Sequence, residues 1–444
     1  MTTSRRIEKV AVMGSGTMGA GIAAHCAANG IEVLLLDMAS DEGPRSAIAA
    51  TAKARMTEGR SPLLDDADNA GRIQTGNFED DLGRVAEADL IVEAIVEDLG
   101  AKRDLFQRLE AVRRDGSILA TNTSGIRLAA IAESMPPRLR RDVAVTHFFN
   151  PVKVMKLVEL VPGEATEAEV VTALDEFLSD RLGKGVVHAK DTVNFIANRI
   201  GCFWLLAGLS EADVALADDL SIEAIDAAMS APVGVPPTGL FGLVDLIGLD
   251  VMGLVATNLA ENLAEGDAGR DCLPMPAEIR AMLDRGQLGR KTGGGFYRMT
   301  KTEGGGRLRE TYDYKSDVWH ESESVTLPEA EQTLEGLLFS DSAIGRYAWR
   351  VMGGTLLYAA GLVPEISDNL VGIDRAMRWG FAWRQGPFQM LDALGPDRVI
   401  ARLEAEGQAV PAMLQVLQGA GATSFYRADG AEYLGTDGAY HTVS

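Results

Sequence analysis

Residues 9–37 read KVAVMGSGTMGAGIAAHCAANGIEVLLLD, and this stretch decides the fold. An apolar run at 9–13 leads into the glycine pattern GSGTMG at 14–19, which opens a helical pattern. A second apolar run follows and ends at Asp37. The pattern GxGxxG indicates a dinucleotide site when it follows a strand and opens a helix, and when the next strand ends in an acidic residue. All of these conditions hold here.

The glycine pattern predicts how the dinucleotide is held. The first glycine permits a tight turn, the second lets the backbone approach the pyrophosphate, and the third lets helix and strand pack closely. The helix N-terminus offers free N–H groups to the phosphates. The acid at the second strand would bind ribose hydroxyls and repel a 2′-phosphate, which predicts NAD rather than NADP. The alternative is a structural turn without a ligand. The predicted cofactor-binding residues of this stretch are Gly14, Gly16, Thr17, Met18, Gly19 and Asp37.

The composition indicates a folded cytoplasmic protein. The chain has 444 residues, of which 46% are apolar and 24% charged, and a formal net charge of −22. A field of that sign repels nucleic acid and anionic membranes, so we expect neither as a partner. No apolar stretch approaches the about 20 residues that span a bilayer. Three scattered cysteines are too few for a disulfide framework or a metal cluster, so we expect no metal.

The pattern of predicted strands and helices divides the chain into four parts. Strands and helices alternate over 1–187, which predicts an α/β Rossmann-type NAD-binding domain with a parallel sheet. Helical patterns dominate 188–300, a polar linker follows at 301–330, and helical patterning returns over 331–444 before a short tail. The predicted fold is a Rossmann-type domain followed by an all-α domain of two repeated helical units.

An internal repeat links the two helical parts. Corresponding segments share apolar, aspartate and aromatic residues in the same order, and both copies end in Phe-Tyr-Arg. The matching pairs are 225–229 with 373–377, 239–245 with 386–392, and 292–298 with 423–427. They predict a duplicated unit whose copies pack on each other, and chance agreement between helical patterns is the alternative.

A histidine and a glutamate predict acid–base chemistry. His147 stands near the end of a predicted strand, where open α/β sheets bind ligands. Glu159 lies within the apolar run at 155–161, and a buried carboxylate is costly unless it is paired. Two neighbouring strands would bring Glu159 against His147, which would set the histidine tautomer and stabilise its charged form.

Two polar segments each leave two interpretations open. The loop at 120–125 contains Asn122 and Ser124, which would bind ribose or a substrate oxygen, or else cap the following helix. Asn198 lies in an apolar helix, either as a satisfied core amide or as a group that faces a cleft.

Together these motifs resemble the 3-hydroxyacyl-CoA dehydrogenase family over about the first 300 residues. The repeated helical unit looks like the dehydrogenase portion of multifunctional fatty-acid β-oxidation proteins, some of which carry an enoyl-CoA hydratase domain. The chain contains no hydratase-like segment, so the sequence leaves open whether it is a fragment, as it leaves open the oligomeric state. The segments that carry the resemblance are 14–19, 92–98, 121–124, 147–151, 191–200 and 288–297.

The resemblance implies roles for the candidate residues. His147 would be the general base for the 3-hydroxyl proton, and Glu159 would orient it. Ser124 and Asn198 would hold the substrate oxygen. The positions that match contacts to NAD or CoA in similar proteins are Glu97, Lys102, Asn122 and Lys291.

The implied reaction is the reversible NAD-dependent oxidation of an (S)-3-hydroxyacyl-CoA to a 3-ketoacyl-CoA in fatty-acid β-oxidation. An acyl-CoA is then the substrate, and an enoyl-CoA hydratase or thiolase is a candidate partner. Two alternatives stay open: a dehydrogenase of another 3-hydroxy acid, and a non-catalytic NAD-binding or structural protein. Val193 and Asn194 stand where many family members have proline and glycine, a departure that affects the entry to the helical domain.

Overall fold

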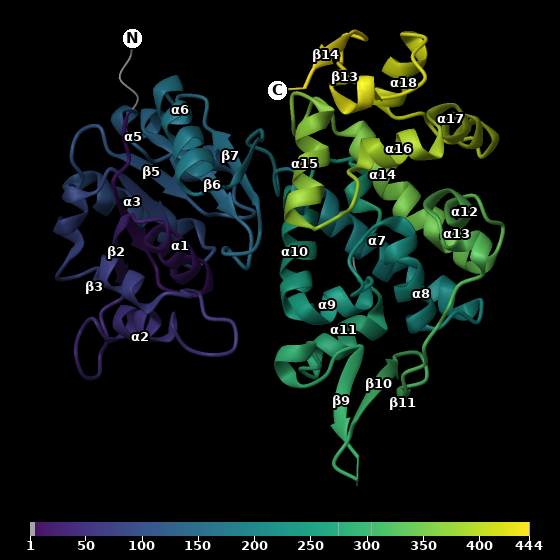
Figure 1. Cartoon of the computed structure of the whole chain (residues 1–444), viewed down its shortest axis with the longest axis horizontal. Coiled ribbons are helices and arrows are strands. Elements are labelled where there is room, and N and C mark those ends of the chain that lie inside the picture. Colours follow the sequence, from purple (N-terminus) through teal and green to yellow (C-terminus); the bar gives the residue numbers. More distant parts are fainter. Residues whose placement is uncertain (1–4, 274, 303, 444) are drawn as a thin grey trace. The chain divides into compact units, whose positions relative to one another are not determined.

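The chain forms two compact units. A computed structural model describes residues 5–273, 275–302 and 304–443. The units are Met1–Phe195 and Ile196–Ser444. In Figure 1 the first is coloured from purple to blue-green and the second from teal to yellow.

The first unit is built on an eight-stranded sheet in the order β3-β2-β1-β4-β5-β6-β7-β8. The strands from β3 to β6 are parallel, and the direction of winding changes between β1 and β4. This is the strand order of the Rossmann fold, so that prediction is confirmed. The strands are β1 Lys9–Met13, β2 Glu32–Asp37, β3 Ile73–Asn77, β4 Leu90–Glu93, β5 Ile118–Thr121, β6 Val143–Phe148, β7 Leu157–Pro162 and β8 Gly185–His188.

Strand β7 departs from the expected parallel arrangement, because it runs antiparallel to β6. The connection at 149–156 is too short for the crossover that a parallel neighbour would need, so the chain turns back directly. Strand β8 then pairs parallel with β7.

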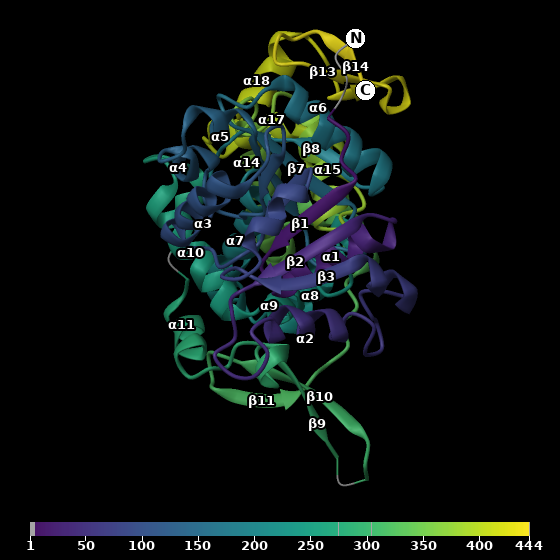
Figure 2. The same ribbon diagram turned by 90° about the vertical axis from the view of Figure 1, so that its left-hand side faces the viewer.

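Helices cover the sheet of the first unit, and α1 is the one that positions the dinucleotide loop. It packs against β1 and β2, where Val10, Ile22 and Leu35 share one core (Figure 2). The helices are α1 Thr17–Ala28, α2 Ala47–Arg55, α3 Leu99–Val112, α4 Leu128–Ala132, α5 Pro137–Arg141 and α6 Ala168–Glu176.

The second unit is mainly helical, and its helices form two groups that follow the two copies of the sequence repeat. The first copy has α7 Ala197–Ala217, α8 Ile222–Ala228, α9 Phe241–Ile247, α10 Leu249–Asn262 and α11 Ala277–Asp284. The second has α12 Leu334–Leu338, α13 Ala343–Ala348, α14 Gly354–Gly361, α15 Leu370–Gly380, α16 Pro387–Leu394, α17 Pro396–Ala405 and α18 Ala412–Gly419. The copies pack together through α7, which contacts α13, α14 and α15.

Each copy also carries a small antiparallel sheet. One consists of β9 Tyr297–Lys301, β10 Arg307–Asp313 and β11 Val318–Glu321, and the other of β12 Tyr426–Arg427, β13 Glu432–Leu434 and β14 Tyr440–Thr442. The polar segment at 301–330 therefore contains two strands, β10 and β11, and Tyr312 of β10 is buried. The β9–β10 hairpin extends away from the helices of its unit (Figures 1 and 2).

The repeat extends to individual hydrogen bonds, as two aspartates in each copy show. Asp226 accepts from the Phe241 N–H at 2.7 Å, and Asp374 accepts from the Phe388 N–H at 2.8 Å. The second aspartate of each copy accepts two consecutive N–H groups at the start of β9 or β12, from the residue before the strand and from its first residue. These donors are Phe296 and Tyr297 for Asp245, and Phe425 and Tyr426 for Asp392. The two copies of the repeat thus share equivalent hydrogen bonds from aspartate side chains to backbone N–H groups.

By length and composition, α7 is apolar enough to cross a membrane, as is the bent pair α9 and α10 when taken together. This differs from the expectation that no apolar stretch approaches such a length. In α7, 67% of the most apolar window is buried inside the protein, as in the core helix of a globular unit. The α9–α10 pair is bent by 93°.

Candidate functional site

The candidate site of the first unit lies where the parallel strands end. Strands β1, β4, β5 and β6 have their carboxyl ends at one edge of the sheet. That edge carries the glycine loop at 14–19, Glu93, Asn122 and His147. Ligands of open α/β sheets bind at this edge, beside the point where the strand order reverses.

The glycine loop leaves no room for side chains at two of its positions. Gly14 has φ +100°, and a Cβ there would lie 2.6 Å from the Ala94 carbonyl oxygen. A Cβ on Gly19 would lie 1.9 Å from the Gly14 carbonyl oxygen. A Cβ on Gly16, by contrast, would meet no atom within 4 Å. The backbone at Gly16 therefore faces open space, as close approach of a pyrophosphate requires.

The start of α1 suits an anionic group. The helix begins at Thr17, and its N-cap Gly16 forms no side-chain capping bond. Its first turn, which includes Met18, contains no acidic residue. The N–H groups and the partial positive charge of this end are thus available to phosphates. These features fit the diphosphate of NAD.

Asp37 has a second role besides the predicted one. Its Oδ2 accepts hydrogen bonds from the Ser15 N–H at 2.5 Å and the Ser15 hydroxyl at 2.6 Å. Its Oδ1 accepts from the Met38 N–H at 2.7 Å. The carboxylate therefore shapes the glycine loop itself. The nearest cation along the chain, Arg45, pairs with Asp80 at 2.6 Å.

A buried ion pair lies at the end of β4. Glu93 is 0% exposed and Lys102 is 1% exposed, and their Oε1 and Nζ atoms are 2.7 Å apart. Glu93 also accepts from the Ile95 N–H at 2.8 Å and the Thr121 hydroxyl at 2.5 Å. Sequence reasoning missed Glu93, although it ends an apolar run just as Glu159 interrupts one.

Glu97 holds the loop that follows β5. Its Oε1 accepts from the Thr123 hydroxyl at 2.6 Å and from the N–H groups of Ser124 at 2.8 Å and Gly125 at 3.0 Å. Its Oε2 is 3.1 Å from Lys102 Nζ. Burial raises the pKa of Glu97, but Lys102 and these hydrogen bonds outweigh it, so the net pKa lies below the ordinary value. Glu97 therefore acts as a charged anchor of the loop.

The loop residues Asn122 and Ser124 differ in their surroundings. Asn122 Oδ1 accepts from the Phe148 N–H at 2.9 Å, which ties the end of β5 to the end of β6. Ser124 is exposed, and its hydroxyl lies 3.5 Å from Glu97. The N–H groups at the start of α4 are instead capped by Asp191, at 2.6 Å from Leu128 and 2.7 Å from Ala129. Ser124 therefore does not cap α4, and its hydroxyl has only the long contact to Glu97.

His147 and Glu159 are in direct contact. They lie opposite each other in the antiparallel β6–β7 register, and His147 Nδ1 is 2.7 Å from Glu159 Oε2. Both side chains are buried. His147 Nε2 forms no hydrogen bond with the residues that the structure describes. The pairing leaves Nε2 as the ring nitrogen that can exchange a proton with a ligand.

Two aromatic rings enclose the histidine. The ring centroids of Phe149 and Phe195 lie 4.4 and 5.7 Å from that of His147. Phe195 has φ +51°, an uncommon conformation for a bulky residue, and Asn194 before it has φ +60°. Asparagine tolerates this left-handed region better than most residues, so Asn194 can adopt it without being glycine.

Two predicted residues belong to the second unit. Asn198 is on the first turn of α7, half-buried, and its side chain forms no hydrogen bond within the described residues. The Asn198 amide therefore has no partner within the described residues that would satisfy it. Lys291 Nζ lies 2.5 Å from Asp250 Oδ1, at the start of α10. The structure brings His147, Glu159, Asn122, Ser124, Glu97 and Lys102 into one unit and places Asn198 and Lys291 in the other.

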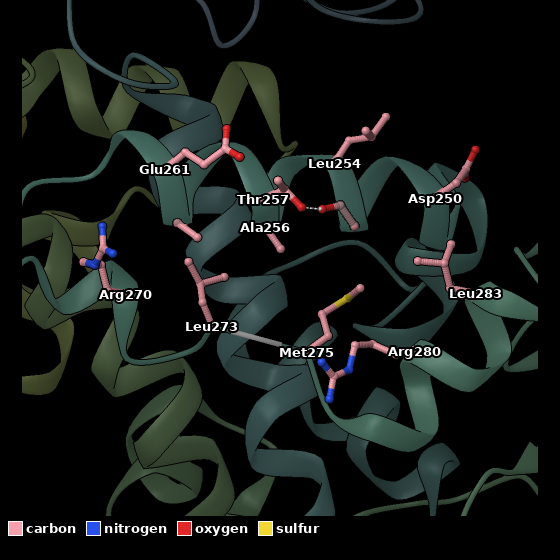
Figure 3. A pocket seen from close by; sticks show the side chains of 12 residues that line it. Asp250, Leu254, Ala256, Thr257, Glu261, Arg270, Leu273, Met275, Arg280 and Leu283 are labelled. Atoms are coloured by element: carbon pink, nitrogen blue, oxygen red, sulfur yellow. Dashed lines mark hydrogen bonds between the residues drawn. The ribbon is translucent and has the colours of Figure 1, made fainter.

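The second unit also contains an apolar cavity of about 970 Å³ beside α10. Figure 3 shows Leu254, Ala256, Leu273, Met275 and Leu283 around it, with arginine side chains at its margin. The Thr257 hydroxyl donates to the Gly253 carbonyl at 3.0 Å, so it is satisfied within the helix (Figure 3).

Two family models match the chain. Residues 9–192 match the NAD-binding domain of 3-hydroxyacyl-CoA dehydrogenase, and residues 195–299 match its C-terminal domain. The boundary between the two matches agrees with the boundary between the two structural units.

Curated relatives and solved structures carry related names. A Bacillus subtilis protein named as a 3-hydroxyacyl-CoA dehydrogenase is 35% identical over 99% of this chain and 58% of its own length. A Rickettsia felis protein named as a fatty acid oxidation complex trifunctional enzyme is 36% identical over 88% of this chain and 54% of its own. The chain thus spans little more than half of these relatives. The crystal structure of 3-hydroxybutyryl-CoA dehydrogenase from Escherichia coli K12 superposes with a TM-score of 0.68, at 27% identity, over 92% of this chain and 98% of that one.

Proposed function

Because the chain belongs to the 3-hydroxyacyl-CoA dehydrogenase family, we propose that it catalyses the reversible oxidation of an (S)-3-hydroxyacyl-CoA to a 3-ketoacyl-CoA. Residues 9–192 form the family's NAD-binding domain, so the cofactor is NAD. The observation that carries the proposal is the buried His147–Glu159 pair at the sheet edge that also bears the glycine loop. Such a pair supplies the proton acceptor that alcohol oxidation needs.

His147 is the general base of the proposed reaction. Its Nε2 takes the proton of the 3-hydroxyl group, and Glu159 at Nδ1 holds the ring and balances its positive charge. NAD supplies the hydride acceptor at C4 of its nicotinamide ring. In the reverse direction the imidazolium returns the proton to the ketone oxygen.

The remaining predicted residues support this chemistry. We propose that Ser124 and Asn198 bind the substrate oxygen, since Ser124 is exposed with only a 3.5 Å contact to Glu97 and the Asn198 side chain forms no hydrogen bond within the described residues. Glu97, Asn122 and Lys291 would contact the cofactor. Lys102 is too deeply buried for direct contact, so it would act by positioning Glu93 and Glu97.

The test is a steady-state assay of acetoacetyl-CoA reduction by NADH with the variant His147→Gln. We expect kcat to fall by about 10²- to 10⁴-fold, the usual contribution of general acid–base catalysis. The matched control is His188→Gln, at an exposed histidine of β8 that pairs with Asp175 at 2.9 Å. Near-normal turnover by His147→Gln, or an equal loss in both variants, would rule out His147 as the base.

The substrate class, partner and location are parts of the same proposal. Comparing an acyl-CoA thioester with its free 3-keto acid separates a CoA-dependent enzyme from a dehydrogenase of another 3-hydroxy acid. The trifunctional name of the R. felis relative supports an enoyl-CoA hydratase or thiolase as partner activity. The described cysteines Cys26, Cys202 and Cys272 are all free and buried, which supports a cytoplasmic location.

A further inference from the structure

A second cavity of the helical unit is lined by arginines. Its volume is about 750 Å³, and it lies beside α9 and the β9–β10 hairpin. Arg290, Arg298 and Arg309 line it, together with Thr238 and Tyr297. This volume is within the range of small-molecule sites, which is roughly 300–1,000 Å³.

The cavity lies in a basic part of an acidic chain. Residues 285–315 contain eight Lys or Arg and three Asp or Glu, whereas the whole chain has a net charge of −22. A local excess of this sign in an otherwise acidic protein attracts anions to one place.

Arg298 has a structural role. Its Nε and NH2 atoms donate to the two oxygens of Glu310 at 2.8 and 3.2 Å. Its guanidinium also lies 4.1 Å from the ring centroid of Trp319. A bidentate carboxylate contact and a stacked aromatic ring account for this arginine without a ligand.

Arg290 and Arg309 form no direct ion pair or hydrogen bond through their side chains within the described residues. Arg309 lies over the Tyr297 ring at 3.9 Å. Both guanidinium groups act through space on Asp245, where their positive charge opposes the rise that burial gives the pKa of that carboxyl. The carboxylate that lines the cavity belongs to Asp245, which is 2% exposed. Its two oxygens accept the N–H groups of Phe296 and Tyr297 at 2.8 and 2.7 Å, so it is committed to the backbone.

The second copy of the repeat shows that the framework does not require these two arginines. Arg427 pairs with Glu432 across β12 and β13 as Arg298 pairs with Glu310 across β9 and β10. The residue before Glu432, however, is Ala431, where the first copy has Arg309. The segment 418–422, which precedes the second Phe-Tyr-Arg, reads QGAGA and contains no cation. Arg290 and Arg309 therefore have no counterpart in the second copy.

We infer that this cavity binds a small molecule through a phosphate group that carries two or more negative charges. Two guanidinium groups that contact no carboxylate directly present planar pairs of donors, a geometry that matches phosphate oxygens. The cavity belongs to the second unit, whereas the dinucleotide loop belongs to the first. The inference does not depend on the proposed reaction.

Calorimetric titration with inorganic pyrophosphate tests the inference on the full chain. Saturating NADH is present throughout, so that the glycine loop is not the site measured. We expect saturable binding that weakens about tenfold or more in the double variant Arg290→Gln/Arg309→Gln, and that weakens with added salt. The matched control is Arg307→Gln, on the same strand but outside the cavity lining, for which we expect less than about a twofold change.

Three results would overturn the inference: no saturable binding, unchanged binding in the double variant, or an equal loss in Arg307→Gln. If the double variant does not fold, Arg290→Gln alone is measured against the same criteria. Parallel titrations with ADP and with coenzyme A identify the source of the phosphate. Tighter binding of either than of pyrophosphate assigns the site to that ligand when the double variant loses it, and equal binding assigns it to the phosphate groups alone.

Discussion

Among single residues, Glu93 and Lys102 connect the core to the candidate site. The pair is almost fully buried, and Lys102 also reaches Glu97, which holds the 123–125 loop. A buried ion pair is costly to break, since the remaining charge loses its partner in a medium that cannot solvate it. One ion pair thus stabilises both the end of β4 and the loop that carries Ser124.

Removing the cation should therefore destabilise the first unit. We expect Lys102→Met to lower the free energy of unfolding by about 3–5 kcal/mol, because Glu93 would be left buried and unpaired. Denaturant titration followed by circular dichroism measures the change. Arg45→Met removes one partner of the exposed Arg45–Asp80 pair and should change the free energy of unfolding much less, because water screens that pair. Equal losses in the two variants would contradict this view of the buried pair.

Glu159 should act through the histidine rather than on the substrate. We expect Glu159→Gln to lower kcat by about 10- to 100-fold, because the charged form of the histidine ring loses its negative partner at Nδ1. A steady-state assay of acetoacetyl-CoA reduction by NADH measures kcat and KM separately. The loss should lie in kcat, with KM changed less than about threefold. A raised KM with an unchanged kcat would contradict this view of Glu159.

At the scale of elements, the sequence predicts most strands that bear site residues. Apolar runs and glycine turns mark β1, β2, β4, β5, β6 and β7 clearly. Two strands of the sheet do not have that signal: β3 reads IQTGN at the sheet edge, and β8 has only four residues. Their pairing depends on tertiary contacts that periodicity does not encode.

Backbone conformation is the second feature that the pattern of apolar residues does not predict. The apolar run at 243–262 predicts one helix, but Gly248 with φ +104° divides it into α9 and α10. Gly395 with φ +82° divides α16 and α17 in the same way. In the site, the His147–Glu159 contact was predictable from a carboxylate in an apolar run. The Asp37–Ser15 contact was not, because it depends on the shape of a loop.

The aspartates of the repeat should make stability depend on pH. Burial raises the pKa of Asp226 and of Asp374 to about 7 in each case, against an ordinary value near 4. The folded state then binds more protons than the unfolded state between about pH 4 and pH 7, so these groups reduce stability as pH rises through that window.

We expect Asp374→Asn to show a smaller loss of stability from pH 4 to pH 7 than the wild-type chain. The variant should also be less stable at pH 5 by about 1–3 kcal/mol, because an amide nitrogen would replace an oxygen that accepts the Gln389 N–H. Thermal unfolding at several pH values measures both quantities. Identical pH dependence in the two proteins would mean that Asp374 does not titrate in this range.

At the scale of the whole molecule, each unit has its own core, and the dinucleotide loop belongs to the first unit only. We expect calorimetry to resolve two unfolding transitions, with NADH raising the midpoint of one. At 100 times its Kd the cofactor should stabilise that transition by about 2.7 kcal/mol. If NADH shifted both transitions equally, or if a single transition appeared, the units would unfold together.

The duplication of the helical unit has a kinetic consequence. Helix α7 of one copy packs against α13 and α14 of the other, and the Tyr347 hydroxyl donates to the Gly208 carbonyl at 3.0 Å. Because one polypeptide joins the two copies, their encounter is unimolecular, and the tether sets an effective concentration of order millimolar. Their contact is therefore insensitive to dilution: it forms at the same rate in a cell that makes few copies of the chain as in one that makes many.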